Sequence, residues 1–218
     1  MRERAINLRD WEVRALHQSV GALLAGADVI VRPIVPQPPS FVETFCQWSP
    51  RLWCPCVPKE ENAPAVSSPY AVGDMLWGRE TWRTEMVAGA VYSGAAIRYA
   101  VDGSLRYVEF AEYEAWEVAH ANQRDGWRSS THMPRWACRV QRTVATVEPV
   151  QVRDIHATVI ERMGFNVAAK LPLIPLPSCF DSVIDAVADK LFSEQWNADW
   201  PEYPYAGNPW GWMYEVTP

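Results

Sequence analysis

The stretch GDMLWGRETW, residues 73–82, predicts a turn at Gly73-Asp74 followed by a strand. Alternate side chains of a strand point to opposite faces of its sheet. One face would carry Met75, Trp77, Arg79 and Thr81, and the other Leu76, Gly78, Glu80 and Trp82. The carboxylate of Glu80 therefore shares a face with a leucine and a tryptophan. Either that face is solvated, or Glu80 lines a pocket, where it accepts hydrogen bonds from a ligand or acts as a general base.

The segments around this strand predict a mixed α+β fold. Two alternating stretches within residues 95–108 flank Asp102-Gly103, which predicts a hairpin with a type I′ turn. Apolar periodicity predicts helices at residues 10–24, from Asp154 to near Gly164, and at 180–196. Alternation predicts strands at residues 29–35, 136–147 and 209–216. Segregated strands and helices favour an α+β domain, most simply a small β-barrel decorated with helices.

Two segments interrupt this order. Residues 36–70 contain recurrent prolines without a hydrophobic period, which predicts a long irregular insertion. Residues 109–122 predict an acidic amphipathic helix as a second insertion. We expect the whole chain, residues 1–218, to form a single domain.

Composition restricts the compartment and the cofactors. No run of about 18 apolar residues is present, and no apolar segment follows the basic N-terminus, so we expect a cytoplasmic protein without membrane contact. The five cysteines, an odd number, argue against a disulfide framework. Cys54-Pro55-Cys56, with Cys46 upstream, lacks the spacing and the nearby histidines of a structural zinc site. We therefore expect no metal and no cofactor.

Charge is unevenly distributed along the chain. The formal net charge of −6 disfavours non-specific binding of long duplexes, which needs many cationic contacts. Between Arg124 and Arg142, however, five arginines accompany one acid, Asp125, whereas the whole chain has three lysines. Arginine suits bidentate contacts to phosphates and bases. Alternatively, these arginines pair with the preceding Glu109, Glu112, Glu114 and Glu117.

Arg128, His132 and Arg135 form a group around a proline that predicts a loop or a strand entry. We interpret them as contacts to phosphate or base at the mouth of a cleft, the alternative being a capping or packing role for His132. The chain has 12 tryptophans, which serve as core residues or as stacking platforms for bases. The core role is favoured for Trp77, Trp82 and Trp136.

Three segments together resemble the ASCH family, phage-type members in particular, whose fold is PUA-like. They are VRALHQSVGALLAGADVIVRPIVPQP at residues 13–38, YAVGDMLWGRETW at 70–82 and STHMPRWACRV at 130–140. The resemblance implies a small barrel with a cleft beside it, with Glu80 in the cleft and Trp82 on the same face. Relatives bind RNA or modified bases. Some remove the acetyl group of N4-acetylcytidine, and others have been proposed as ribonucleases.

The family amidohydrolases use a lysine, a threonine and a glutamate. The residues of this chain that match their pattern are Gly26, Arg32 and Glu80. Asp28 stands at the lysine position, and Val29 and Val31 stand at threonine positions. Valine offers no hydroxyl nucleophile and an aspartate repels a developing oxyanion, so we expect this chemistry to be absent. A different site would arise if Asp28 and Glu80 lie close, because one carboxyl pKa would rise and the pair could transfer a proton.

The favoured function is binding of a nucleoside, a nucleotide or single-stranded RNA in the cleft. The expected ligand-binding residues are Arg32, Glu80, Trp82, Arg128, His132 and Arg135. One alternative is a hydrolase that acts on a modified nucleoside through Glu80 with Asp28. Another is a phage protein of the host cytoplasm that sequesters a nucleotide signal or grips a host protein with its two insertions.

Overall fold

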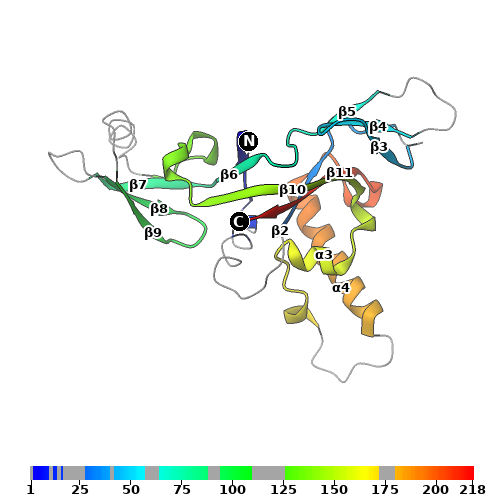
Figure 1. Cartoon of the computed structure of the whole chain (residues 1–218). Coiled ribbons are helices and arrows are strands. Elements are labelled where there is room, and N and C mark those ends of the chain that lie inside the picture. Colours follow the sequence, from blue (N-terminus) through cyan, green and yellow to red (C-terminus); the bar gives the residue numbers. More distant parts are fainter. Residues whose placement is uncertain are drawn as a thin grey trace. The chain divides into compact units, whose positions relative to one another are not determined.

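The computed structural model describes residues 2–9, 12–13, 16, 28–39, 42–56, 64–87, 94–109, 126–171 and 180–218. Over these ranges the chain is mixed α+β, with three sheets and two α-helices, and its strands close no barrel (Figure 1). The chain divides into two compact units. Unit 1 comprises Met1–Arg2, Ala22–Asp74 and Thr143–Pro218, and unit 2 comprises Glu3–Gly21 and Met75–Arg142.

The sheet of unit 1 is built on the C-terminal strand β11 (Trp210–Thr217). β11 pairs antiparallel with β10 (Val140–Gln151) on one side and with β2 (Asp28–Pro33) on the other. β11 confirms the predicted strand at residues 209–216, and its alternate residues Trp210, Trp212, Tyr214 and Val216 are all buried. The predicted start of β10 at residue 136 is wrong, because residues 135–137 form the 3-10 helix η2 (Arg135–Ala137).

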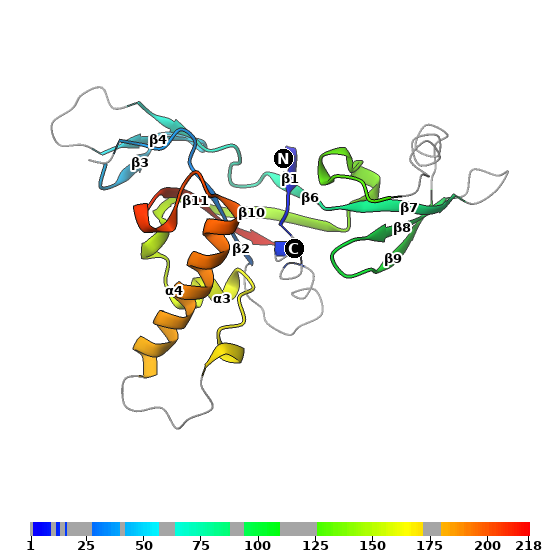
Figure 2. The ribbon, with the colours of Figure 1, turned by 180° about the vertical axis from the view of Figure 1, so that it is seen from behind.

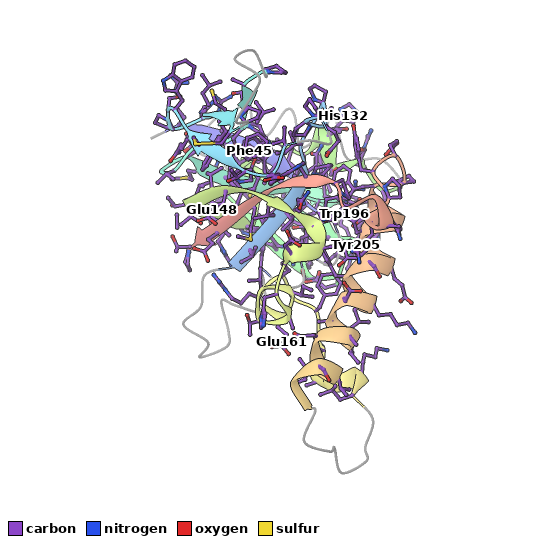
Figure 3. All side chains as sticks on the ribbon, turned by 90° about the vertical axis from the view of Figure 1, so that its right-hand side faces the viewer. Phe45, His132, Glu148, Glu161, Trp196 and Tyr205 are labelled. Atoms are coloured by element: carbon purple, nitrogen blue, oxygen red, sulfur yellow. A yellow bond between two sulfur atoms is a disulfide. The ribbon has the colours of Figure 1, made fainter. Side chains whose placement is uncertain are left out.

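Two α-helices belong to unit 1, α3 (Ala157–Arg162) and α4 (Phe180–Asp199), and they lie side by side in both views (Figures 1 and 2). α4 confirms the predicted helix and extends it by three residues, from 196 to 199. The predicted cap of α3 is wrong: Asp154 lies in η3 (Val152–Asp154), and the His156 side chain accepts the hydrogen bond from the Thr158 amide. Trp196 of α4 and Tyr205 lie close to one another in Figure 3, and the Phe192 ring, also of α4, makes edge contacts with both rings. Two further 3-10 helices are η4 (Ala168–Lys170) and η5 (Tyr205–Gly207).

The predicted irregular insertion at residues 36–70 contains a small antiparallel sheet. Its strands are β3 (Phe45–Gln47), β4 (Leu52–Pro55) and β5 (Val66–Ser67). Cys46 and Cys56 form a disulfide, which the odd cysteine count did not predict, and Cys54 is free. Packing in unit 1 explains why a proline-rich segment becomes ordered, because the Phe45 ring packs against Trp210 and the Trp53 ring against Trp212.

Unit 2 contains a parallel strand pair and an antiparallel three-stranded sheet. β1 (Glu3–Asn7), which the sequence patterns did not predict, pairs parallel with β6 (Met75–Arg79). The other strands are β7 (Trp82–Val87), β8 (Ala95–Tyr99) and β9 (Leu105–Val108), in the order β7-β8-β9. The β8–β9 hairpin is confirmed but its turn is not type I′, because of its two central residues only Gly103 has a positive φ.

The core of unit 2 is the cluster of Trp82, Ala95, Ile97, Tyr99, Met133 and Ala137. Within the predicted helix at residues 10–24, the structure describes Glu12, Val13 and Leu16, which are helical and buried. The rest of that helix and residues 110–122 of the predicted acidic helix lie outside the described residues.

Candidate nucleic-acid interface

The two faces of β6 alternate as its sequence predicts. Leu76, Gly78 and Glu80 are buried, whereas Met75, Trp77 and Arg79 are partly exposed. The alternative of a solvated Glu80 face is wrong, because Glu80 is 2 % exposed and Trp82 is fully buried. The space that Gly78 leaves is filled by Leu8 and Val140, whose side chains any Cβ at this position would meet. The accessible face of β6 is therefore the one that carries Trp77.

Glu80 is the counter-ion of a buried arginine. Its Oε1 accepts from Arg139 Nε and its Oε2 from Arg139 Nη2, both at 2.7 Å. The third nitrogen, Nη1, donates to Asp102 Oδ2 and to Ser104 Oγ, also at 2.7 Å each. The guanidinium carbon lies 4.1 Å from the centroid of the Tyr99 ring. Arg139 thus joins the connection between β6 and β7 to the turn of the β8–β9 hairpin.

Ion pairing stabilises the charged forms of Arg139 and Asp102. Burial alone would lower the pKa of Arg139, but its bonds to Glu80 and Asp102 raise it above the ordinary value. Burial would raise the pKa of Asp102, but the hydrogen bonds from Arg139 and Ser104 together outweigh this and lower it. Burial raises the pKa of Tyr99 to about 12. Since both oxygens of Glu80 are bound by one guanidinium, the geometry favours a structural role for this carboxylate.

Trp77 lies between two arginines on the accessible face of unit 2. The guanidinium carbon of Arg79 is 5.6 Å from the Trp77 ring centroid and that of Arg135 is 5.9 Å from it, both within cation–π range. Arg79 Nη1 donates to the Thr131 carbonyl at 3.0 Å, and Arg135 Nε donates to Glu3 Oε2 at 3.3 Å. Strand β1 places Ala5 opposite Trp77, whose side chain is partly exposed.

A second arginine–tryptophan pair lies on the same unit. The guanidinium carbon of Arg83 is 4.9 Å from the Trp127 ring centroid, and Trp127 is 46 % exposed. Arg83 also donates to Glu85, which accepts from Arg98 as well. The hydrogen bond from Arg98, followed by that from Arg83, lowers the pKa of Glu85 to about 2. Arg83 therefore shares one carboxylate with Arg98.

The remaining predicted site residues separate into exposed and enclosed ones. His132 is exposed at the end of η1 (Ser130–His132), and the Arg128 side chain is partly exposed while its backbone bonds both ways with Trp82. Trp82 is wholly enclosed in the unit 2 core, so its ring offers no stacking surface. Arg32 lies in β2 of unit 1, with its guanidinium carbon 5.9 Å from the Trp200 ring centroid.

The predicted Asp28–Glu80 pair is untested, and two residues outside the predicted set, Arg139 and Trp77, belong to the site. The side chain of Asp28, the first residue of β2, lies outside the described residues, so the Asp28–Glu80 pair stays a prediction. Arg139 and Trp77 were not among the predicted site residues, although both lie within the quoted motifs. The sequence signal for Arg139 was the arginine group at residues 124–142, which does not reveal that one member is buried.

Within the described residues, members of the arginine group pair with acids outside the preceding block, of which Glu112, Glu114 and Glu117 lie outside the described residues. In the described ranges, Arg139 binds Glu80 and Asp102, and Arg135 binds Glu3. Arg142 is also buried and donates to the Gln141 and Leu16 carbonyls. Within the described part of this group, Arg128 and Arg135 remain partly exposed, and Arg135 lies beside Trp77.

No group of three or more histidine, cysteine, aspartate or glutamate side chains within the described ranges is arranged to hold a metal ion. No helix in the described part of the chain is long and apolar enough to cross a membrane.

Comparisons of the chain with protein-family models, curated proteins and solved structures found no match. The resemblance to the ASCH family therefore rests on the quoted motifs alone.

Proposed function

We propose that the protein binds a nucleotide or a short single-stranded RNA segment through the Trp77 face, defined as Trp77, Arg79, His132 and Arg135. The observation that carries this proposal is the placement of two guanidinium groups at 5.6 and 5.9 Å from one partly exposed indole ring. Bases stack on tryptophan regardless of sequence, and each stacked base contributes about 1–3 kcal/mol. Guanidinium groups beside the ring supply the donors for the adjoining phosphates.

The hydrogen bonding of the two arginines supports a role toward a ligand. Within the described ranges, Arg79 bonds only through Nη1 to Thr131, and its Nε is buried without a partner. Arg135 holds exposed Glu3 through a single nitrogen, and such a surface contact contributes little. The buried Nε of Arg79 cannot reach a ligand, but Nη2 of Arg79 and Nη1 of Arg135 make no hydrogen bond with the described residues and can donate to phosphate oxygens.

The charge of the chain limits the length of the ligand. A net charge of −6 disfavours binding through a long track of phosphates. Two phosphate contacts to a single strand would give a salt slope of about −1.4 in log K against log salt. The ligand that fits is one base stacked on Trp77 with its neighbouring phosphates.

The resemblance to the ASCH family points in the same direction, because relatives of that group bind RNA or modified bases. We also propose that the fold is PUA-like. Its Trp-x-Arg-Glu motif would comprise Trp77 to Arg79 of β6 and Glu80, which directly follows that strand. The hydrolase alternative receives no support from Glu80, since Arg139 binds both of its oxygens.

Mass spectrometry of a mixture of nucleosides, nucleotides and short RNAs incubated with the purified protein tests the proposal. Depletion of one species that returns intact after denaturation supports binding. Accumulation of a new mass would contradict it in favour of the hydrolase, and the mass difference would name the bond that is broken. A mixture that remains unchanged in every species would also refute it.

A further inference from the structure

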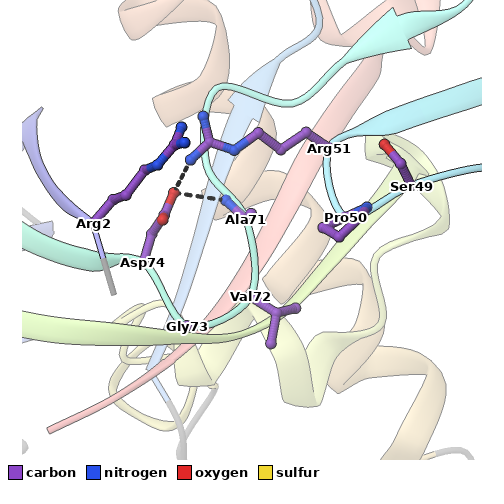
Figure 4. Close-up of a pocket in the computed structure, with 8 residues that line it drawn as sticks. All are labelled: Arg2, Ser49, Pro50, Arg51, Ala71, Val72, Gly73 and Asp74. Atoms are coloured by element: carbon purple, nitrogen blue, oxygen red, sulfur yellow. Dashed lines mark hydrogen bonds and ion pairs between the residues drawn. The ribbon is translucent and has the colours of Figure 1, made fainter.

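A cavity of about 410 Å³ in unit 1 brings together three segments that are distant in the sequence. They are the N-terminal Arg2, the turn Ser49–Arg51 between β3 and β4, and the turn Ala71–Asp74 before β6. Figure 4 shows the guanidinium groups of Arg2 and Arg51 pointing toward one another beside the carboxylate of Asp74. None of these residues belongs to the Trp77 face.

The charges of this cavity favour an anion. Two guanidinium groups face one carboxylate, so the lining has a formal charge of +1. Asp74 is already engaged, because its Oδ2 accepts from Arg51 Nη2 and from the Ala71 amide. Its side chain is 7 % exposed, whereas that of Arg51 is 26 % exposed. Asp74 therefore orients the Arg51 guanidinium group through Nη2, and the other N–H donors of that group remain available at the cavity that Arg51 lines.

Several donors remain for a ligand. Arg2 is exposed and makes no hydrogen bond or ion pair with the described residues, and Arg51 bonds there only through Nη2. Ser49 Oγ accepts from the Leu52 amide at 3.2 Å, which leaves its hydroxyl proton to donate. Pro50, Ala71 and Val72 supply an apolar wall.

We propose that this cavity binds the phosphate group of a phosphate monoester, with Arg2 and Arg51 as two forks on its oxygens and the apolar wall against the ester group. Arginine forks match the geometry of phosphate, and a bridging dianion relieves the repulsion between two neighbouring guanidinium groups. The proposal is independent of the Trp77 face, because it uses other residues and another unit.

The test is an amide chemical-shift titration of the full chain with inorganic phosphate and, separately, with phenyl phosphate. We expect saturable shifts of the Ser49, Ala71, Gly73 and Asp74 amides with both probes. Phenyl phosphate should bind more tightly if the natural ligand is an ester, whereas equal affinities would identify free phosphate and overturn the ester assignment.

Variants make the test specific. Arg2→Gln removes an exposed side chain, so it should leave the fold intact and weaken phosphate binding about tenfold, the loss expected for one charge-assisted bond. Arg2→Lys should restore part of the affinity through charge alone. Arg153→Gln, an exposed arginine elsewhere in unit 1, is the matched control and should bind as the parent protein does. Absence of saturable shifts, or equal affinity in Arg2→Gln, would overturn the proposal.

Discussion

Replacing Arg139 with leucine removes both guanidinium donors from Glu80 and leaves its carboxylate in the core of unit 2. The side chains of Arg139 and Glu80 are 7 % and 1 % exposed, so water cannot replace the lost bonds. Removing one partner of a buried ion pair costs about 3–5 kcal/mol of unfolding free energy. For a chain of this length, each kcal/mol lowers the melting temperature by roughly 2–4 °C, so we expect a decrease of about 6–20 °C.

Urea unfolding and thermal melting followed by tryptophan fluorescence measure this effect. Asp102→Asn is the matched control, because the Asp102 side chain is 38 % exposed and its bond to Arg139 should contribute only about 1 kcal/mol or less. The double variant Glu80→Leu with Arg139→Leu should cost less than the sum of its single variants by about 0.5–3 kcal/mol, since no buried charge is left unpaired and Asp102 is partly exposed. If Arg139→Leu unfolds like the parent protein, the pair is not buried and the structural role of Glu80 is refuted.

Three further changes test other parts of the fold. Gly94→Ala should destabilise unit 2 by about 1–3 kcal/mol in urea unfolding, because Gly94 has a φ of +150° and a Cβ there would meet a β9 carbonyl. Gly207→Ala is the control: a Cβ at that position meets no atom, so the variant should be neutral. Tyr214→Phe should cost about 0.5–1.5 kcal/mol through loss of the buried hydroxyl pair with Ser68 at 3.0 Å, and an unchanged urea midpoint would contradict that bond. The pKa of Glu85 falls from 4.5 to about 2 on folding, so its contribution is complete above pH 4.5 and is lost as the pH falls toward 2. Glu85→Gln should therefore flatten the dependence of unfolding free energy on pH in that window, and a parallel curve would refute the assignment.

Sequence patterns predicted the elements that are determined by residues close to one another in the chain. The alternation of residues 75–80 gives the burial of Leu76 and Glu80, and the apolar stripe of residues 180–196 gives α4. Asp102-Gly103 identified the hairpin, but the structure uses Asp102 to accept from the Ser104 amide rather than as the first residue of a type I′ turn. Sequence could place this hairpin because both strands and the turn lie within a few residues of one another.

Long-range partners decided the features that sequence patterns missed. β1 is a strand because it pairs with β6, about 70 residues later in the chain, as in Glu3 opposite Met75. The role of Glu80 depends on Arg139, 59 residues away, and no local spacing joins the two. Without that partner, the same carboxylate on an apolar face predicts a pocket. The proline-rich segment likewise became a sheet through Phe45 and Trp53, which pack on aromatic rings of β11.

In the proposed function, Trp77 and its two arginines hold a base and its phosphates. The most direct measurement is fluorescence anisotropy of a labelled single-stranded RNA with a 5′-hydroxyl end, titrated with the parent protein, Trp77→Leu and Arg135→Ala at several salt concentrations. We expect Trp77→Leu to weaken binding by about tenfold, in line with one lost stacked base, and Arg135→Ala to reduce the salt slope by about 0.7. Trp48→Leu, which removes a tryptophan that is 75 % exposed in unit 1, should bind as the parent protein does. Equal affinity and equal salt slope in the parent protein and both Trp77-face variants would contradict binding of RNA by the Trp77 face.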